Sequence, residues 1–452
     1  MTFTRSVTRL GMPARVAAIR RDPLLRSSFY LMLTMTLGAA AGFLFWILVA
    51  RLYPAADVGR ASSLIACVYL LSYFSLFGLS TTLVRTLPTS VRPGEEVSTA
   101  VSTVSACTLV ISGTFVALLP WTAPQLNFVH DSPWRVVAFV VLAGAAALNL
   151  LTDSVFIAFR ATRINLVING VLMSAVKVAL PFALVAAGPF GIFLASGIAS
   201  LVAATASITM IRRSLRVHLR PFFSWGVLRN TLRYSLTNYA ASTLNLVAQI
   251  VLPLVVLERL GPVPAATFFI AFQIANLLNS AAYAIGEALF AEGSRARAHL
   301  PSLARRSAGT MLAVIAPAAA FVALLAGPIL GLFGDEYARD GTSSLIVLAA
   351  SALATAFYAW TSFLLKVTRQ LTAMIAAEVV SVSVMLGITV LMLDSGLVWA
   401  AIAWGLGNLA SGSFAAVALV RSKLRHRTAP RRHRYRQPEA RCENPAHRQH
   451  RQ

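Results

Sequence analysis

Twelve long apolar runs alternate along this chain with short segments that carry most of its charged residues. A transmembrane α-helix needs about 20 consecutive apolar residues, and each run is about that long. The basic stretch Ile211–Arg233 contains six Arg and separates six runs from six. Such a charged segment lies at a membrane surface and not within the bilayer. The pattern predicts an all-α integral membrane protein with twelve transmembrane helices in two six-helix lobes. The expected spans are 28–50, 61–84, 98–119, 134–159, 164–187, 190–211, 234–257, 265–290, 307–333, 342–365, 371–393 and 397–420.

The same pattern divides the chain into five segments. Residues 1–27 hold six Arg and form a basic cytoplasmic arm, followed by the N-lobe over residues 28–211. A cytoplasmic loop over 212–233 leads to the C-lobe over 234–420. Residues 421–452 are rich in Arg and His and have no apolar periodicity, so we expect a disordered basic cytoplasmic tail.

Composition agrees with a membrane protein, because 57% of the residues are hydrophobic, 12% are charged and the mean hydropathy is +0.72. A net charge of +23 would fit a nucleic-acid-binding protein, but the basic residues lie between and beyond the apolar runs. With the amino terminus in the cytoplasm, the segments on that side hold 33 Lys and Arg and the opposite segments hold 5. This asymmetry predicts that both termini are cytoplasmic. We expect no nucleic-acid partner.

The two halves repeat one another at an offset of 208 residues. The motif Arg51-Leu-x-Pro, at the outer end of the first span, returns as Arg259-Leu-x-Pro at the outer end of the seventh. Single identities occur by chance in apolar sequence, but a shared offset at equivalent span positions indicates a duplication. Six spans per half make the repeats parallel, with a substrate path between the halves. Other matched pairs are Ser72 with Ser280, Gly78 with Gly286, Pro120 with Pro328, Gly188 with Gly396, and Gly197 with Gly405.

The seventh and eighth spans each carry a line of polar side chains at steps of three and four residues. Each line therefore occupies one helix face. Two full-length stripes on adjacent helices favour the wall of a water-filled cavity that binds substrate. The alternative is that these side chains join packed helices through hydrogen bonds. The stripes are Asn238, Ser242, Asn245 and Gln249 on the seventh span, and Gln273, Asn276, Ser280, Tyr283 and Glu287 on the eighth.

Lys177 lies fourteen residues into the fifth span, near the bilayer midplane. A charge at that depth costs about 2.5–3.5 kcal/mol and tends to mark a transport pathway. Asp153, Glu287 and Glu378 fall toward the cytoplasmic ends of their spans, so no acid lies level with it. We expect Lys177 to face the cavity. The alternative is a structural Lys bonded to carbonyl groups of a helix broken near Pro181.

Other charged and small residues within the spans add candidate roles. Arg85, which ends the second span, and Asp153 are candidates to line an inward-facing vestibule, although anchoring at the membrane interface also accounts for Arg85. Asp153 and Glu378 are the candidates for ion coupling. In the first span, Gly38 and Gly42 have the spacing that allows close helix contact.

Several sites of enzyme chemistry are absent from the sequence. None of the three Lys completes a phosphate-binding loop, and no HExxH motif or credible nucleophile–base set occurs. Cys67 and Cys107 lie in apolar runs and Cys442 in the tail, without CxxC spacing, so we expect no metal site and no disulfide. The sequence therefore favours a secondary transporter over an enzyme, with no cofactor.

Two stretches carry a family resemblance. In Arg51–Pro88, the spacing from Arg51 to Gly59 and the pattern F-G-L ending at Arg85 are typical of one group of exporters, and Leu151–Leu180 matches its fourth and fifth spans. The chain resembles the O-antigen and polysaccharide flippases of the multidrug/oligosaccharidyl-lipid/polysaccharide (MOP) exporter superfamily. The resemblance implies a V-shaped, MATE-like pair of six-helix lobes around a cationic cavity. It also implies an undecaprenyl-diphosphate-sugar substrate. The second half is less rich in motifs, and the basic tail lies outside the common pattern.

These observations predict a bacterial inner-membrane flippase that exports a lipid-linked oligosaccharide or polysaccharide precursor by alternating access. Its partners would be that substrate, the membrane lipids, and glycosyltransferases or a polymerase. One alternative is a multidrug antiporter of the same superfamily, which would use Asp153 or Glu378 to exchange ions for an organic cation. The other is a non-transporting scaffold for a polysaccharide synthesis complex.

Overall fold

The computed structural model describes residues 23–215, 217, 246, 249–295 and 299–428, and these residues form helices joined by short links. Eleven helical segments within these residues are long and apolar enough to cross a membrane. They correspond to eleven of the twelve expected spans. The remaining one, expected at 234–257, falls mostly outside the described residues, although 249–260 are helical. The all-α fold class predicted from the sequence is confirmed.

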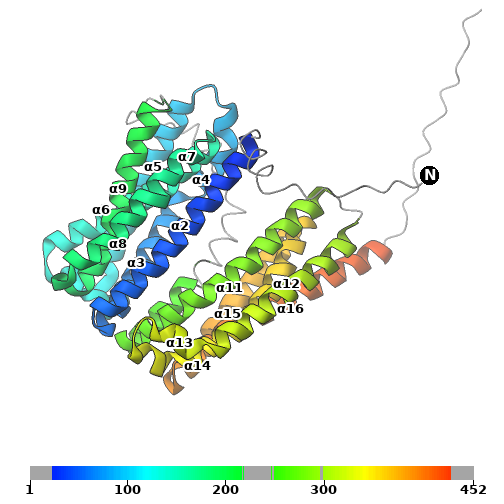
Figure 1. Ribbon diagram of the computed structural model, residues 1–452. Coiled ribbons are helices and arrows are strands. Elements are labelled where there is room, and N and C mark those ends of the chain that lie inside the picture. Colours follow the sequence, from blue (N-terminus) through cyan, green and yellow to red (C-terminus); the bar gives the residue numbers. More distant parts are fainter. Residues whose placement is uncertain (1–22, 216, 218–245, 247–248, 296–298, 429–452) are drawn as a thin grey trace, which may run out of the picture.

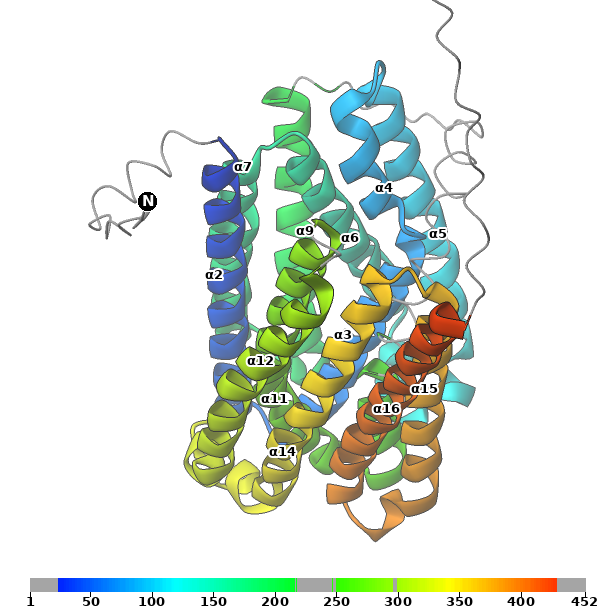
Figure 2. The ribbon, with the colours of Figure 1, turned by 90° about the vertical axis from the view of Figure 1, so that its right-hand side faces the viewer.

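The helices form two groups that lie side by side in Figure 1. The first group, the N-lobe, consists of α2 (Pro23–Leu52), α3 (Ala55–Leu76), α4 (Leu79–Thr86), η1 (Leu87–Thr89), α5 (Pro93–Thr122), η2 (Pro124–Asp131), α6 (Pro133–Ala158), α7 (Thr162–Asn165), η3 (Leu166–Met173), α8 (Ser174–Ala183), η4 (Val185–Ala187) and α9 (Gly188–Arg213). The second group, the C-lobe, consists of the helix over 249–260, α11 (Pro262–Arg295), α12 (Leu300–Leu324), α13 (Ala326–Gly331), α14 (Asp335–Val367), α15 (Leu371–Met392), η6 (Leu393–Ser395) and α16 (Val398–Thr428). Within the C-lobe, α14 packs against α11, α12 and α16 (Figure 2).

Several boundaries differ from the sequence prediction. The ninth span, expected at 307–333, is α12 (Leu300–Leu324), and α13 is a separate short helix after it. The second span is broken into α3 and α4, because Phe77 and Gly78 both adopt left-handed backbone with φ of 44° and 72°. The apolar pattern runs through this break and hides it. Helix α2 begins at Pro23, inside the expected arm, and α16 continues to Thr428, so residues 421–428 of the expected disordered tail are helical.

The predicted repeat is visible in the helices and their ends. The short helices η4 and η6 are 208 residues apart and are followed by Gly188 and Gly396, both with positive φ. Arg160 and Arg369, with φ of 54° and 59°, follow the ends of the equivalent helices α6 and α14. A left-handed residue is a common way to end a helix. The same backbone devices therefore recur in both lobes.

The lobes contact each other at one end and diverge toward the other (Figure 1). We call the contacting end the outer end, because it carries the links expected outside the cytoplasm, and the opposite end the inner end. Trp46 packs against Phe269 with ring centroids 4.6 Å apart, and Phe43 against Phe333 at 5.4 Å. At Gly59, a Cβ atom would lie 1.8 Å from the carbonyl oxygen of Pro262, so only glycine allows α3 to approach α11 this closely.

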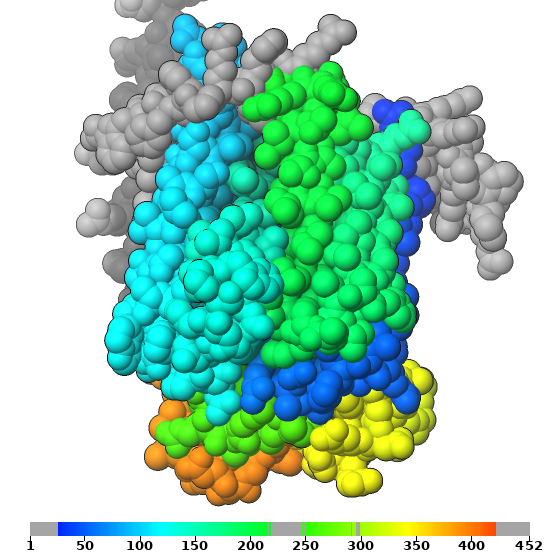
Figure 3. Space-filling view, turned by 90° about the vertical axis from the view of Figure 1, so that its left-hand side faces the viewer, coloured from blue at the N-terminus to red at the C-terminus, as the bar shows by residue number. Residues whose placement is uncertain are grey.

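The hydrophobic cores follow the same division. The largest core contains residues of both lobes, including Phe45 and Phe268, whereas each smaller core lies within one lobe. Seen from the N-lobe side, the C-lobe emerges beyond it at the outer end, in yellow and orange (Figure 3). The two lobes therefore form a V that is closed at the outer end.

Helix α2 has open space on both faces. On one face, where α2 packs against η3 and α8, a groove of about 570 Å³ is lined on α2 by Leu37, Ala40, Ala41 and Leu44. The other face carries Gly38 and Gly42, and a Cβ at either position would meet no atom within 4 Å. The expected close helix contact at these glycines is therefore wrong. Both glycines line a cavity between the lobes.

Candidate functional site

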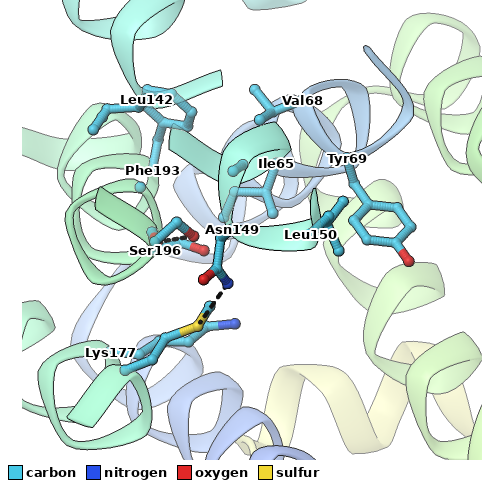
Figure 4. Close-up of a pocket in the computed structure, with 13 residues that line it drawn as sticks. Ile65, Val68, Tyr69, Leu142, Asn149, Leu150, Lys177, Phe193 and Ser196 are labelled. Atoms are coloured by element: carbon cyan, nitrogen blue, oxygen red, sulfur yellow. Dashed lines mark hydrogen bonds between the residues drawn. The ribbon is translucent and has the colours of Figure 1, made fainter. Parts of the chain in front are cut away.

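Two cavities share Lys177 as a lining residue. The N-lobe cavity, of about 250 Å³, lies among α3, α6, η3, α8 and α9 (Figure 4). The inter-lobe cavity, of about 270 Å³, lies between α2, α8, α11 and the outer end of the C-lobe. Lys177 lines both. The polar residues of the N-lobe cavity are Tyr69, Asn149, Lys177, Ser196 and Ser200, and those of the inter-lobe cavity are Lys177, Gln273, Asn276 and Ser280.

Lys177 is held by its helix and by an aromatic ring. It lies on α8, directly after the π-helix η3, and Pro181 one turn later leaves the Lys177 carbonyl without its helical donor. The ammonium Nζ lies 4.9 Å from the ring centroid of the fully buried Phe45, within cation–π range. Tyr53, in the link between α2 and α3, donates a hydrogen bond of 2.9 Å to the Pro181 carbonyl, and burial raises the pKa of its hydroxyl.

The charge of Lys177 has no acidic neighbour in the described part of the chain. The ion pairs found there join other residues, and none contains Lys177. A cation within a membrane-spanning helix is normally paired, so the absence of a described carboxylate beside the partly buried Lys177 leaves room for an anion supplied by a ligand.

Asn149 is the main polar group of the N-lobe cavity. It comes from α6 and is 7% exposed. Its Nδ2 donates to the Met173 sulfur at 3.6 Å, while its Oδ1 has no hydrogen-bond partner within the described chain. Figure 4 shows the amide directed toward the part of the cavity that holds the Lys177 side chain. The cavity therefore combines an unpaired acceptor with a cation.

The polar stripe predicted on the eighth span lies on α11, and its outer part lines the inter-lobe cavity. Gln273 and Ser280 are exposed there, and Ser280 donates to the Asn276 carbonyl at 2.8 Å. Tyr283 and Glu287 lie further toward the inner end and line neither cavity. The Tyr283 ring is 6.5 Å from that of Phe363, and Glu287 is exposed.

The remaining candidates are spread over the molecule. Arg85 is exposed at the inner end of α4 and lines neither cavity. Gln249, in the helix over 249–260, is partly buried. The other three residues of the seventh-span stripe, Asn238, Ser242 and Asn245, lie outside the described residues.

The two acids proposed for ion coupling lie in different lobes. Asp153 accepts a hydrogen bond from the Asn169 amide, which also donates to Asn165 Oδ1 at 2.6 Å. Glu378 is 4% exposed and accepts a hydrogen bond from the Tyr358 hydroxyl. Neither acid lines either cavity. Within the described residues, no three His, Cys, Asp or Glu side chains gather into a group that would hold a metal.

The sequence reasoning missed one polar line on the fifth span. Asn165, Asn169, Met173 and Lys177 recur every four residues and lie along one side of the helix formed by α7, η3 and α8. The signal was present in the spacing. The pattern was overlooked because aliphatic residues lie between these positions and only Lys177 was considered.

Comparisons with known proteins agree with this architecture. A family model described as "Polysaccharide biosynthesis protein" matches residues 48–340, more than half of the chain. No curated protein matches the chain significantly.

Solved structures of low identity share the fold. One is described as the inward-facing conformation of a multidrug resistance MATE family transporter of the MOP superfamily, with 18% identity, 89% of this chain and 99% of that chain covered, and a TM-score of 0.68. The outward-facing conformation of such a transporter has a TM-score of 0.58 at 18% identity, covering 90% and 97% of the two chains. The lipid II flippase MurJ, in an inward closed conformation, has 11% identity, 87% coverage of each chain and a TM-score of 0.69. The chain therefore belongs to the polysaccharide biosynthesis protein family and has the two-lobed membrane fold of the MOP superfamily.

Proposed function

We propose that this protein is a flippase that moves a lipid-linked oligosaccharide or polysaccharide precursor across the bacterial inner membrane by alternating access. The observation that carries the proposal is Lys177, a cation that lines both the N-lobe cavity and the inter-lobe cavity and that forms no ion pair among the described residues. The diphosphate of an undecaprenyl-diphosphate-linked sugar would supply the missing negative charge. Coulombic attraction is stronger in such a site than in water.

The polar face of α11 supports a sugar ligand. Gln273, Asn276 and Ser280 present amide and hydroxyl groups to the inter-lobe cavity, and such groups bind sugar hydroxyls. The family is described by polysaccharide biosynthesis, and one structural neighbour is a flippase of lipid II. Both descriptions favour a lipid-linked glycan over a drug.

The shape of the molecule indicates which step of transport it represents. The lobes contact at the outer end and diverge at the inner end (Figure 1). The TM-score of 0.68 with an inward-facing transporter exceeds the 0.58 with an outward-facing one. With the basic loops and both termini in the cytoplasm, the open side would receive substrate from the cytoplasmic leaflet.

We also propose the boundaries and partners that accompany this role. The two lobes, over 28–211 and 234–420, would rock about Lys177, with the loop over 212–233 as their cytoplasmic joint. Asp153 in the N-lobe and Glu378 in the C-lobe are the proposed ion-coupling groups. Glycosyltransferases or a polymerase acting on the same glycan are the proposed protein partners.

The test is a flipping assay with purified protein in liposomes. A fluorescent undecaprenyl-diphosphate oligosaccharide is placed in both leaflets of the liposomes. A membrane-impermeant reagent added outside then bleaches the label in the outer leaflet, and the fluorescence of the protected inner leaflet is followed over time. Wild-type protein should deplete the protected fraction, whereas empty liposomes and Lys177→Glu should not. The same vesicles with a proton gradient and a cationic dye test the multidrug antiporter. Transport of the dye without the glycan would overturn the flippase in favour of the antiporter.

A further inference from the structure

Among the described residues, the N-lobe cavity contains an acceptor without a donor and a cation without a carboxylate. Asn149 is 7% exposed, its nitrogen is occupied by Met173, and its Oδ1 accepts no hydrogen bond within the described chain. Lys177 lines the same cavity and forms no ion pair there. A buried acceptor without a donor costs free energy in the folded protein, as does a buried unpaired charge. A ligand that satisfies both groups would recover that free energy.

These two groups restrict the chemistry of the ligand. A metal cation would be attracted to the Asn149 oxygen but repelled by the Lys177 ammonium in the same cavity. A bare anion would pair with Lys177 but leave the Asn149 oxygen without a donor. The ligand that fits carries an anionic oxygen and, close to it, a hydroxyl or amide N–H. A sugar attached to a phosphate has this combination.

We propose that the N-lobe cavity is the subsite for the first sugar of the lipid-linked glycan, the one bonded to the diphosphate. Asn149 Oδ1 accepts a hydrogen bond from a hydroxyl or amide group of this sugar while Lys177 binds the phosphate. The inference rests on the proposed function and adds that Asn149 recognises the sugar next to the diphosphate. The rest of the glycan lies in the inter-lobe cavity, beside the polar face of α11.

The size and walls of the cavity agree with a single sugar. Its volume of about 250 Å³ is at the lower end for ligand pockets, which run from about 300 to 1,000 Å³, and this suits one sugar ring better than an oligosaccharide. Tyr69 and Phe193 line it from α3 and α9, and aromatic rings pack well against the C–H faces of a sugar. Lys177 lines both this cavity and the inter-lobe cavity, and the phosphate linkage would lie beside it.

The experiment measures binding to the purified full-length protein in lipid nanodiscs by quenching of its tryptophan fluorescence. The probes are undecaprenyl diphosphate and undecaprenyl-diphosphate-N-acetylglucosamine. Wild-type protein should bind the sugar-bearing lipid about five- to tenfold more tightly, which is the worth of one hydrogen bond to a buried group. Asn149→Leu should lose this preference and keep wild-type affinity for the bare diphosphate. Lys177→Ala should weaken the binding of both probes.

A matched control is available on α16. Asn408 is a buried Asn at 4% exposure whose amide donates only to the Trp404 carbonyl of its own helix, and it lines neither cavity, so Asn408→Leu should keep the preference. A second measurement needs only wild-type protein: a probe whose sugar is methylated at every hydroxyl and carries no amide should bind no better than the bare diphosphate.

The outcomes separate the two claims. If Asn149→Leu keeps the preference, or wild-type protein prefers the methylated probe, the subsite is overturned and the flippase proposal stands. If Asn408→Leu loses the preference as well, the effect is a general loss of structure and the subsite is again overturned. If wild-type protein binds neither lipid, the flippase proposal itself is overturned.

Discussion

At the scale of single residues, Lys177 is a cation within the helices that has no acid beside it in the described part of the chain. Lys177 rests over the Phe45 ring, and the ring face offsets part of the cost of removing the ammonium from water. A cation–π contact supplies about 0.5–2 kcal/mol, less than the 2.5–3.5 kcal/mol estimated for a charge at this depth. The difference is what an anionic ligand would supply.

Substitutions of Lys177 test this account. Lys177→Arg keeps the charge with a different geometry, so partial export is expected. Lys177→Ala removes the charge and its insertion cost, so expression should hold or rise while export falls. Lys177→Glu should be worst, because it repels the diphosphate. The measurement is complementation of a glycan-export mutant with protein levels checked by immunoblot.

A second lysine provides the control for this series. Lys366 has its Nζ 4.5 Å from the Phe363 ring centroid, a similar cation–π contact, but it lines neither cavity and interacts with the carboxylates of Glu378 and Glu287. Lys366→Arg keeps this charge away from the cavities, so it should export normally where Lys177→Arg exports only in part. Wild-type export by a well-expressed Lys177→Glu protein would assign Lys177 to the structure and not to the substrate.

Glycine positions allow a test of the packing that supports the site. A Cβ at Gly286 on α11 would lie 2.2 Å from the Phe363 ring, so Gly286→Ala should destabilise the protein by about 1–3 kcal/mol. Gly309, on α12, has no atom within 4 Å of such a Cβ, and Gly309→Ala should stabilise by up to about 1 kcal/mol through helix propensity. Thermal unfolding followed by size-exclusion chromatography compares the two. Equal melting points would contradict the tight contact between α11 and α14.

At the scale of elements, the polar face of α11 can be tested for whether it lines a water-filled cavity or packs against other helices. Cysteines replacing Gln273 and Ser280 should react with a membrane-impermeant thiol reagent, in a background without native cysteines, because both side chains are exposed in the inter-lobe cavity. Cysteines at the buried neighbours Ala275 and Ala282 should stay protected. Equal protection of all four positions would favour hydrogen-bonded packing.

The outer ends of the lobes are joined by Arg51. From the end of α2 its Nε and Nη2 donate to the carbonyls of Leu332 and Gly331, at 2.9 and 2.6 Å, and so hold the C-terminal end of α13 on the other lobe. Arg51→Ala should weaken this contact between the lobes by about 1 kcal/mol, since the Arg51 side chain and its hydrogen bonds are exposed. The equilibrium between the two conformations should then shift about fivefold toward the outward-open state. Reagent added outside should then label Gln273→Cys faster.

The repeat supplies the control for Arg51. Arg259 occupies the equivalent position, but its guanidinium bonds to Asp394 of its own lobe at 3.2 Å. Arg259→Ala should leave the rate of outside labelling unchanged. A similar acceleration in both variants would mean that loss of any outer-end charge, and not the contact between lobes, opens the molecule.

The contrast between these two arginines shows which features can be predicted from the sequence and which cannot. Apolar length located the spans because the bilayer thickness fixes the length of a helix. The spacing of identities revealed the repeat, and depth along a helix singled out Lys177. The hydrogen bonds of Arg51 and the contact of Lys177 with the Phe45 ring each join residues more than a hundred positions apart. These contacts depend on tertiary packing, which no local sequence pattern contains. The break at Phe77 was missed because a left-handed residue leaves hydrophobicity unchanged.

At the scale of the whole molecule, the distribution of basic residues makes a prediction about orientation. The inside segments hold 33 Lys and Arg against 5 outside, so the amino terminus, the tail and the loop over 212–233 should face the cytoplasm. Fusions of a cytoplasmic reporter at Arg229 and in the tail should be active, and fusions of a periplasmic reporter there should be silent. A periplasmic signal at Arg229 would exclude the twelve-span arrangement.

Helix α2 lies between two open spaces, the inter-lobe cavity on one side and the groove on the other. Ala39 and Gly42 border the inter-lobe cavity, while Ala40 and Ala41 border the groove beside α8. A lipid with its polar head beside Lys177 and its tail in the groove would straddle a single helix, so the tail would never have to enter the polar interior. The two sides are also open to separate modification. A large side chain at Ala40 narrows the path of the tail alone, and one at Ala39 narrows the room for the head alone.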